Sequence, residues 1–65
     1  MQILINQIPH EIPDRSTVSD ALSIYQAKPP FAAALNLNFL PKVKYTQTIL
    51  KENDELEVIS PVTGG

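Results

Sequence analysis

The sequence predicts a single α+β domain in which one helix packs on one face of a mixed β-sheet. Three observations lead to this fold class: strand-like alternation opens and closes the chain, a helical apolar stripe lies between, and 65 residues suffice for one core. At this size folding buries only about 60 % of the surface that the unfolded chain exposes. A deep catalytic cleft would compete with the core, so we do not expect a self-contained enzyme.

The first two strands are predicted to form a hairpin. Residues 1–6 alternate apolar and polar side chains, and a second alternating segment follows a turn at Asn6 and Gln7. Pro9 and Pro13 have no amide hydrogen to donate, which confines the second strand to a sheet edge.

The helix is expected to begin near Val18. Thr17 and Asp20 are spaced as a weak capping box, which satisfies free amides of the first turn. Pro29 and Pro30 are expected to stop the helix. The apolar stripe falls at helical spacing and consists of Val18, Ala21, Leu22 and Tyr25.

The run FAAALNLNFL fits either one strand or a tight hairpin that turns on its asparagines. We favour a strand over 32–36 and a short return over 38–40. A helical turn around Lys42–Tyr45 and a short extended piece at residues 49–50 are expected next. In the turn over 51–54, Asn53 can adopt the left-handed conformation that otherwise calls for glycine.

The segment ELEVIS predicts a final strand with an apolar side and a mostly acidic side. Residues 1–60 then form the domain, and residues 61–65 are expected to form a flexible C-terminal tail. With the helix as a right-handed crossover, the first and last strands lie parallel and adjacent, and the proline-bearing strand lies at an edge. This is the β-grasp layout of ubiquitin-like proteins.

The composition excludes several function classes. Hydrophobic residues make up 43 % and charged residues 18 %, as in soluble globular domains, and the net charge is −2 with scattered basic residues. Nucleic acid is therefore not an expected partner. The absence of cysteine excludes disulfides and thiolate metal sites. With neither a signal peptide pattern nor an apolar run of ~18 residues, we expect a cytoplasmic protein without membrane association, monomeric when free.

Several segments together resemble the ThiS family of sulfur carrier proteins of thiamine biosynthesis. They are MQILIN at the start, TVSDAL at the helix, ALN at the third strand, ENDELEV at the final hairpin and the terminal GG. The resemblance covers the whole chain at matching length. It implies that the chain is a protein cosubstrate and not an enzyme.

The resemblance also implies a chemistry for the C-terminal carboxylate of Gly65. A ThiF-like adenylyltransferase would use ATP to adenylate it, sulfur from a donor protein would convert it to a thiocarboxylate, and thiazole synthase (ThiG) would receive the sulfur. ATP belongs to the activating enzyme, and no cofactor is expected on this chain. A free carboxylate, with a pKa of ~3.5, is a poor electrophile and needs such activation.

Glycines occur only at positions 64 and 65. Without Cβ atoms, Gly64 and Gly65 suit a narrow channel in a partner's active site, and five extended residues reach about 17 Å. We expect Val62 and Thr63 to contact partners as well. Leu4 and Ile59 are predicted on the open side of the sheet, where they form either a docking patch for partners or a minor apolar cluster under the 37–50 loops.

Other chemistry-bearing residues have simpler interpretations. His10 lacks convergent ligands, so we expect no metal site and no catalytic role. Ser16, Thr17 and Ser19 are explained by helix capping. Solvated surface, and not a cation site, is expected for the acidic residues Glu52, Asp54, Glu55 and Glu57.

Three alternative functions remain open at this point. A MoaD-like small subunit of molybdopterin synthase shares the fold and the activation but passes sulfur to a pterin precursor, and it tends to be longer. A ubiquitin-like modifier would conjugate to lysines through Gly65. In a plain interaction module the two glycines would have no chemistry.

Overall fold

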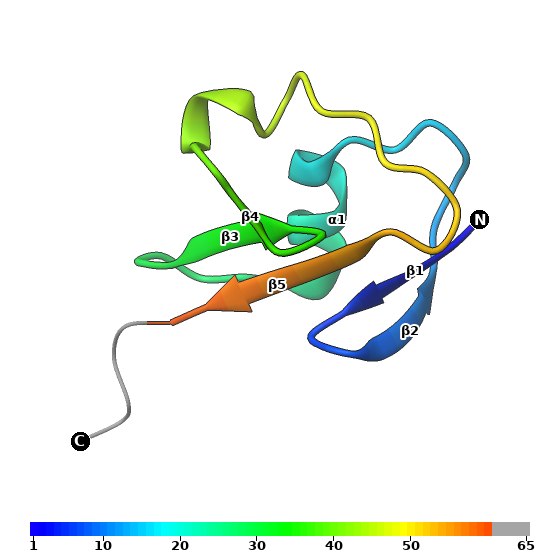
Figure 1. The fold of residues 1–65 in the computed structure, drawn as a ribbon, viewed down its shortest axis with the longest axis horizontal. Coiled ribbons are helices and arrows are strands. Elements are labelled where there is room, and N and C mark those ends of the chain that lie inside the picture. The colour runs from blue at the N-terminus through cyan, green and yellow to red at the C-terminus, as the bar shows by residue number, and fades with distance from the viewer. Residues whose placement is uncertain (61–65) are drawn as a thin grey trace.

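The computed structural model describes residues 1–60, which form a five-stranded mixed sheet with one helix on one face (Figure 1). The strand order is β2-β1-β5-β3-β4, with β1 and β5 parallel and the other neighbours antiparallel. The predicted fold class and the central parallel pair are therefore confirmed. The elements are β1 (Gln2–Ile5), β2 (Ile8–Glu11), α1 (Val18–Tyr25), β3 (Ala32–Leu35), β4 (Asn38–Leu40), a 3₁₀ helix (Lys42–Lys44) and β5 (Glu55–Ile59).

The turns follow the predicted asparagine positions. Asn6 and Gln7 connect β1 to β2 with φ of 51° and 67°, and Asn36 and Leu37 connect β3 to β4 with φ of 49° and 71°. Two consecutive residues of positive φ match the right-handed twist of the strands in a tight hairpin. Asn53 also adopts positive φ, at 69°, in the turn before β5. The preference for two strands in FAAALNLNFL is confirmed.

Helix α1 begins as predicted but ends earlier than expected. The Thr17 hydroxyl accepts from the Asp20 amide at 3.1 Å, and the Asp20 carboxylate accepts from the Thr17 amide at 3.0 Å. The helix ends at Gln26, whose left-handed conformation directs the following amide back to Leu22. The prediction that Pro29 and Pro30 stop the helix was wrong, because the chain has already left it at Gln26. No helix among residues 1–60 is long and apolar enough to span a membrane.

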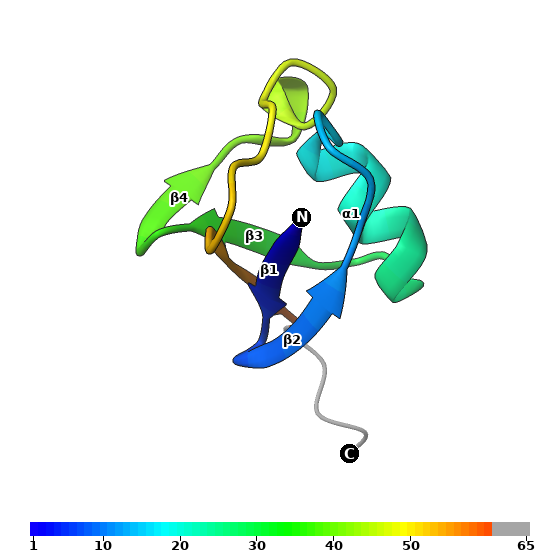
Figure 2. The ribbon, with the colours of Figure 1, turned by 90° about the vertical axis from the view of Figure 1, so that its right-hand side faces the viewer.

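Helix α1 lies over one face of the sheet (Figure 2), and the apolar core is formed between them. The extended piece at residues 49–50 closes one end of this core, since Leu50 is buried and its amide donates to the Ser16 carbonyl at 2.8 Å. Thr17 and Ile49 form an isolated β-bridge. The buried apolar side chains are Ile3, Ile5, Ile12, Val18, Ala21, Leu22, Ala33, Leu50 and Leu56.

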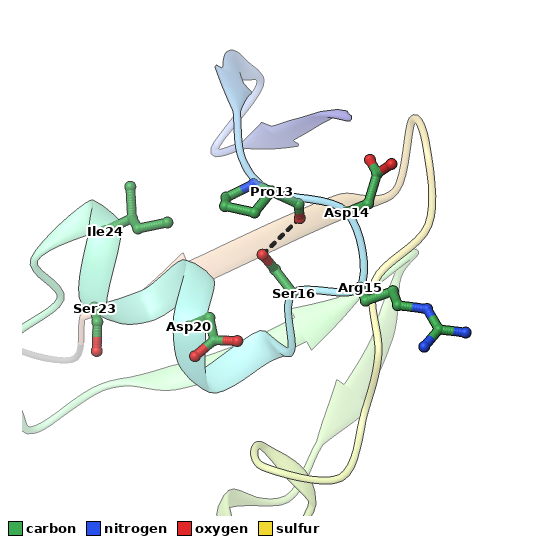
Figure 3. Close-up of a pocket in the computed structure, with 7 residues that line it drawn as sticks. All are labelled: Pro13, Asp14, Arg15, Ser16, Asp20, Ser23 and Ile24. Atoms are coloured by element: carbon green, nitrogen blue, oxygen red, sulfur yellow. Dashed lines mark hydrogen bonds between the residues drawn. The ribbon is translucent and has the colours of Figure 1, made fainter.

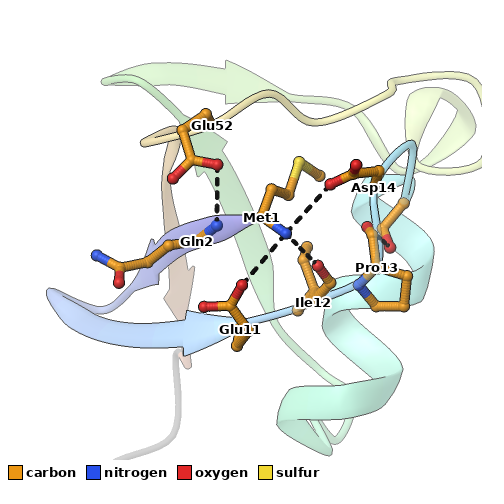
Figure 4. A network of polar contacts seen from close by, with 8 residues as sticks. Met1, Gln2, Glu11, Ile12, Pro13, Asp14 and Glu52 are labelled. Atoms are coloured by element: carbon orange, nitrogen blue, oxygen red, sulfur yellow. Dashed lines mark hydrogen bonds and ion pairs between the residues drawn. The ribbon is translucent and has the colours of Figure 1, made fainter.

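The α-ammonium group of Met1 joins β1 to the segment that follows β2 (Figure 4). It donates to the Ile12 carbonyl at 2.7 Å and to Asp14 Oδ1 at 3.2 Å, and it lies 3.4 Å from Glu11 Oε2. The hydrogen bond to Asp14 raises the pKa of the ammonium group above its ordinary value of 8.0, with a smaller contribution from Glu11. The charged amine thus links β1 to the segment after β2 at one end of the sheet. The C-terminal end of β5 lies at the other end.

Candidate functional site

Strand β5 is the central strand of the sheet and the last strand along the chain (Figure 1). It pairs with β1 on one side and with β3 on the other, up to the Ala32–Ile59 pair. The predicted site residues Val62, Thr63, Gly64 and Gly65, and the predicted tail as a whole, lie outside the described residues. The described part of the candidate site consists of β5 and the sheet face around it.

Two asparagine side chains extend the hydrogen bonding of β5 beyond its neighbouring strands. The backbone amide of Asn36 donates to the Glu55 carbonyl at 2.7 Å, and the side-chain Oδ1 of Asn36 accepts from the Glu55 backbone amide at 2.9 Å. On the opposite edge of β5, the backbone amide of Asn6 donates to the Leu56 carbonyl at 2.9 Å, and the side-chain Oδ1 of Asn6 accepts from the Val58 backbone amide at 2.8 Å. Both ends of the strand are thus fixed by turn residues.

The two apolar residues predicted on the open side lie on the sheet face opposite α1. Leu4 is paired with Glu55, so both side chains project to the same face, and Ile59 follows Glu55 at an even spacing along β5. Leu4 is half-buried and Ile59 is 52 % exposed. Four residues along a strand span about 13 Å, so Leu4 and Ile59 share this face without being neighbours. The exposure of Ile59 favours the docking patch over a buried secondary cluster.

Sequence reasoning missed the aromatic residue of this face. Phe39 pairs with Ala34, and Ala34 pairs with Glu57, so all three side chains lie on the same side as Ile59. Phe39 is 70 % exposed, and Leu37 in the adjoining turn is 83 % exposed. A signal was present, because a two-residue turn at 36–37 reverses the alternation and moves Phe39 away from the core side. We call the set of Leu4, Ala34, Phe39, Glu55, Glu57 and Ile59 the open face.

The charges on the open face are all negative. Within residues 1–60, neither Glu55 nor Glu57 makes an ion pair. A small hollow of about 50 Å³ lies beside them, with Leu4 and Leu37 among its lining residues. Apolar side chains flanked by uncompensated carboxylates form a surface that suits a partner with apolar and basic groups.

A pocket of about 430 Å³ lies beside the start of α1, and two of its polar side chains, Ser16 and Asp20, make local hydrogen bonds (Figure 3). The Ser16 hydroxyl donates to the Pro13 carbonyl at 2.7 Å, and Asp20 is held in the capping box.

His10, on β2, lies with its Nδ1 2.9 Å from the Ile8 carbonyl and its ring edge-on to Tyr25. Within residues 1–60 no three acidic or histidine side chains gather as metal ligands.

A model of the ThiS family matches residues 3–65. The chain belongs to the ThiS family. The fold agrees, since the crystal structure of the thiamine biosynthesis protein ThiS from Geobacter metallireducens superposes with a TM-score of 0.84 at 22 % identity, covering 100 % of both chains. A solution structure of a thiamine biosynthesis protein from the same organism superposes with a TM-score of 0.78 at 22 % identity, covering 100 % of this chain and 87 % of that one. No curated protein matches the chain.

Membership of the ThiS family establishes the general role. The family consists of sulfur carrier proteins of thiamine biosynthesis, which are not enzymes, so this chain is a sulfur carrier. The predicted β-grasp layout is likewise confirmed by the superposition over the whole chain. The thiamine role that the resemblance implied is therefore preferred to the molybdopterin alternative.

Proposed function

We propose that this carrier holds sulfur as a thiocarboxylate on the C-terminal carbonyl carbon of Gly65. The observation that carries the proposal is the family match, which extends through Gly64 and Gly65. A sulfur carrier without cysteine needs another group to bond sulfur, and the resemblance to the ThiS family implies that this group is the C-terminal carboxylate. We expect the reaction in the cytoplasm, where ThiS family proteins typically act.

The proposed loading reaction has two stages. A ThiF-like adenylyltransferase joins the Gly65 carboxylate to the α-phosphate of ATP and releases pyrophosphate, which gives an acyl-adenylate with AMP as leaving group. A donor persulfide then displaces AMP and forms an acyl disulfide with Gly65. A second cysteine thiol, supplied by a partner protein, attacks the donor sulfur of this bond, so that a disulfide forms between the two partner thiols and the thiocarboxylate leaves. The carrier contributes the acyl group, and the partners contribute the acid and base groups.

The loaded carrier then delivers its sulfur to a thiazole synthase of the ThiG type. The same terminal residues enter the active sites of both partners, and the lack of Cβ atoms at Gly64 and Gly65 allows a close approach of the backbone. Val62 and Thr63 line the approach and contact the partner. After delivery the carboxylate is regenerated and the carrier is available for another cycle.

The open face is the proposed docking surface for the partners. Its most exposed apolar members are Ile59 and Phe39. Ile59 is the last residue of β5, and Phe39 lies on β4, which is separated from β5 by β3 alone. Exposed apolar groups of this kind mark interaction sites. Glu55 and Glu57 favour a partner surface that carries lysine or arginine beside its own apolar residues, because opposite charges steer association.

The proposal is tested by incubating the intact chain with the activating enzyme, ATP and a sulfur donor protein, followed by mass spectrometry. The expected product has the mass increase of one oxygen replaced by sulfur, and it supports thiazole formation with purified thiazole synthase. A matched variant lacking Gly65 should unfold at the same temperature and acquire no sulfur. An unchanged mass for the intact chain would refute the proposal, and lasting adducts on other proteins would indicate a modifier instead.

A further inference from the structure

One residue joins three parts of the fold beside the C-terminal half of β5. Asn6 lies at the end of β1, where the chain turns away into β2 with positive φ. Its backbone amide is the last β1-side donor to β5, reaching the Leu56 carbonyl at 2.9 Å. The Asn6 side chain then continues the pairing, because its Oδ1 accepts from the Val58 amide at 2.8 Å.

The orientation of the Asn6 side chain is fixed by a second hydrogen bond. Its Nδ2 donates to the Tyr25 hydroxyl at 2.8 Å, and Tyr25 is the last residue of α1. With Nδ2 directed to the helix, Oδ1 is directed to Val58. The end of α1, the β1–β2 turn and the Val58 amide of β5 are thus joined by the side-chain amide group of Asn6.

This contact lies beside the C-terminal end of β5. Val58 precedes Ile59, the last residue of β5, and Gly65 follows Val58 by seven residues. Beyond Asn6 the β1 side offers no further strand to β5, whereas the β3 side remains paired up to Ile59. A strand held on one side only is free to bend away from the sheet plane, and the Asn6 side chain supplies the missing contact.

We propose that Asn6 is a positioning residue that sets the direction in which β5 delivers the C-terminal residues to partner enzymes. This inference rests on the proposed function, in which those residues enter a partner's active site. If the Asn6 contact is lost, only a fraction of carriers has the binding-competent direction, and the apparent affinity falls by that fraction. The turnover of carriers that do bind is unaffected.

The chain contains a matched control at the other end of the same strand. Asn36 has the same residue type, nearly the same φ, and the same bond from its Oδ1 to a β5 amide. It holds Glu55, which is the first residue of β5 and remote from the terminus. Glycine accepts positive φ without strain, so Asn6→Gly and Asn36→Gly each remove two side-chain hydrogen bonds while leaving the turn permitted.

The test compares wild type, N6G and N36G with the activating enzyme and ATP, measuring pyrophosphate release at a temperature where all three are folded. We expect N6G to raise KM about fivefold at unchanged kcat, the factor that a typical net hydrogen bond represents. N36G removes a bond to the backbone amide of Glu55 and leaves the Glu55 carboxylate in place, so it should lower the melting temperature without raising KM. Asn6→Asp, which keeps an oxygen acceptor for Val58, should restore most of the affinity.

Amide hydrogen exchange of the free carrier provides a readout that does not depend on the partner. We expect the Val58 amide to lose protection in N6G and to keep it in N36G. Equal KM values for N6G and N36G, with wild type active, would overturn the positioning role and leave the proposed function standing. No activation of wild type would overturn the proposed function, and the positioning role that rests on it.

Discussion

Replacing Phe39 by alanine tests whether the open face docks the activating enzyme. The side chain is 70 % exposed in the free carrier, so its removal costs the fold little. A phenylalanine of roughly 200 Å² then offers about 140 Å² to a partner, worth at most about 3.5 kcal/mol at ~25 cal/mol per Å². Ordering and desolvation reduce this gain, and we expect a loss of about 1–2 kcal/mol, or roughly 5–30-fold in KM.

The assay is pyrophosphate release at varied carrier concentration, together with thermal unfolding of each variant. Val43→Ala is the matched control, because Val43 is similarly exposed, at 75 %, but lies on the 3₁₀ helix away from the open face. Phe39→Ala should raise KM while Val43→Ala leaves it unchanged, and both should melt close to wild type. Equal KM values for the two variants would show that the open face is not the docking surface.

Three further predictions concern the charges and the helix cap. Glu55→Gln with Glu57→Gln should raise KM and weaken its dependence on salt, as measured from low to high ionic strength, because the steering charges are lost. Thr17→Ala removes the cap hydroxyl and should cost about 1 kcal/mol, lowering the melting temperature by roughly 4–8 °C, whereas Ser19→Ala should not. The pKa of the Met1 ammonium group is higher in the folded than in the unfolded chain, so its ion pairs contribute to the stability of the fold. This contribution is complete below the ordinary pKa of 8.0, and it is lost as the pH rises through the higher pKa of the folded state. Melting temperatures measured from neutral pH upward should therefore fall in this range, and acetylation of the amine should abolish that component.

The main elements of the fold were predictable because each has a local cause. Alternating side chains define β1 and β5, the Thr17–Asp20 pair defines the start of α1, and asparagines take the positive φ that tight turns require. The end of α1 was predicted wrongly because prolines are strong local signals. Gln26 takes a left-handed conformation that is usual for glycine, and its sequence context gave no sign of it.

The candidate site was predictable only where it depends on strand alternation. The sheet face of Leu4 and of Ile59 follows directly from the alternation of side chains along β1 and β5. The sheet face of Phe39 can be predicted only if the length of the turn at Asn36–Leu37 is known. The bonds from Asn6 to Val58 and Tyr25 join residues far apart in the sequence. They depend on the tertiary arrangement, so no local pattern indicates them.

The most direct test of the central claim is to locate the sulfur within the loaded carrier. The chain is incubated with the activating enzyme, ATP and a sulfur donor protein, and the product is fragmented in the mass spectrometer. We expect the mass increase of one oxygen replaced by sulfur only on fragments that contain Gly65, and its loss when thiazole synthase and its substrates are added. Sulfur on fragments that end before Gly65, or a fully loaded variant lacking Gly65, would contradict the account.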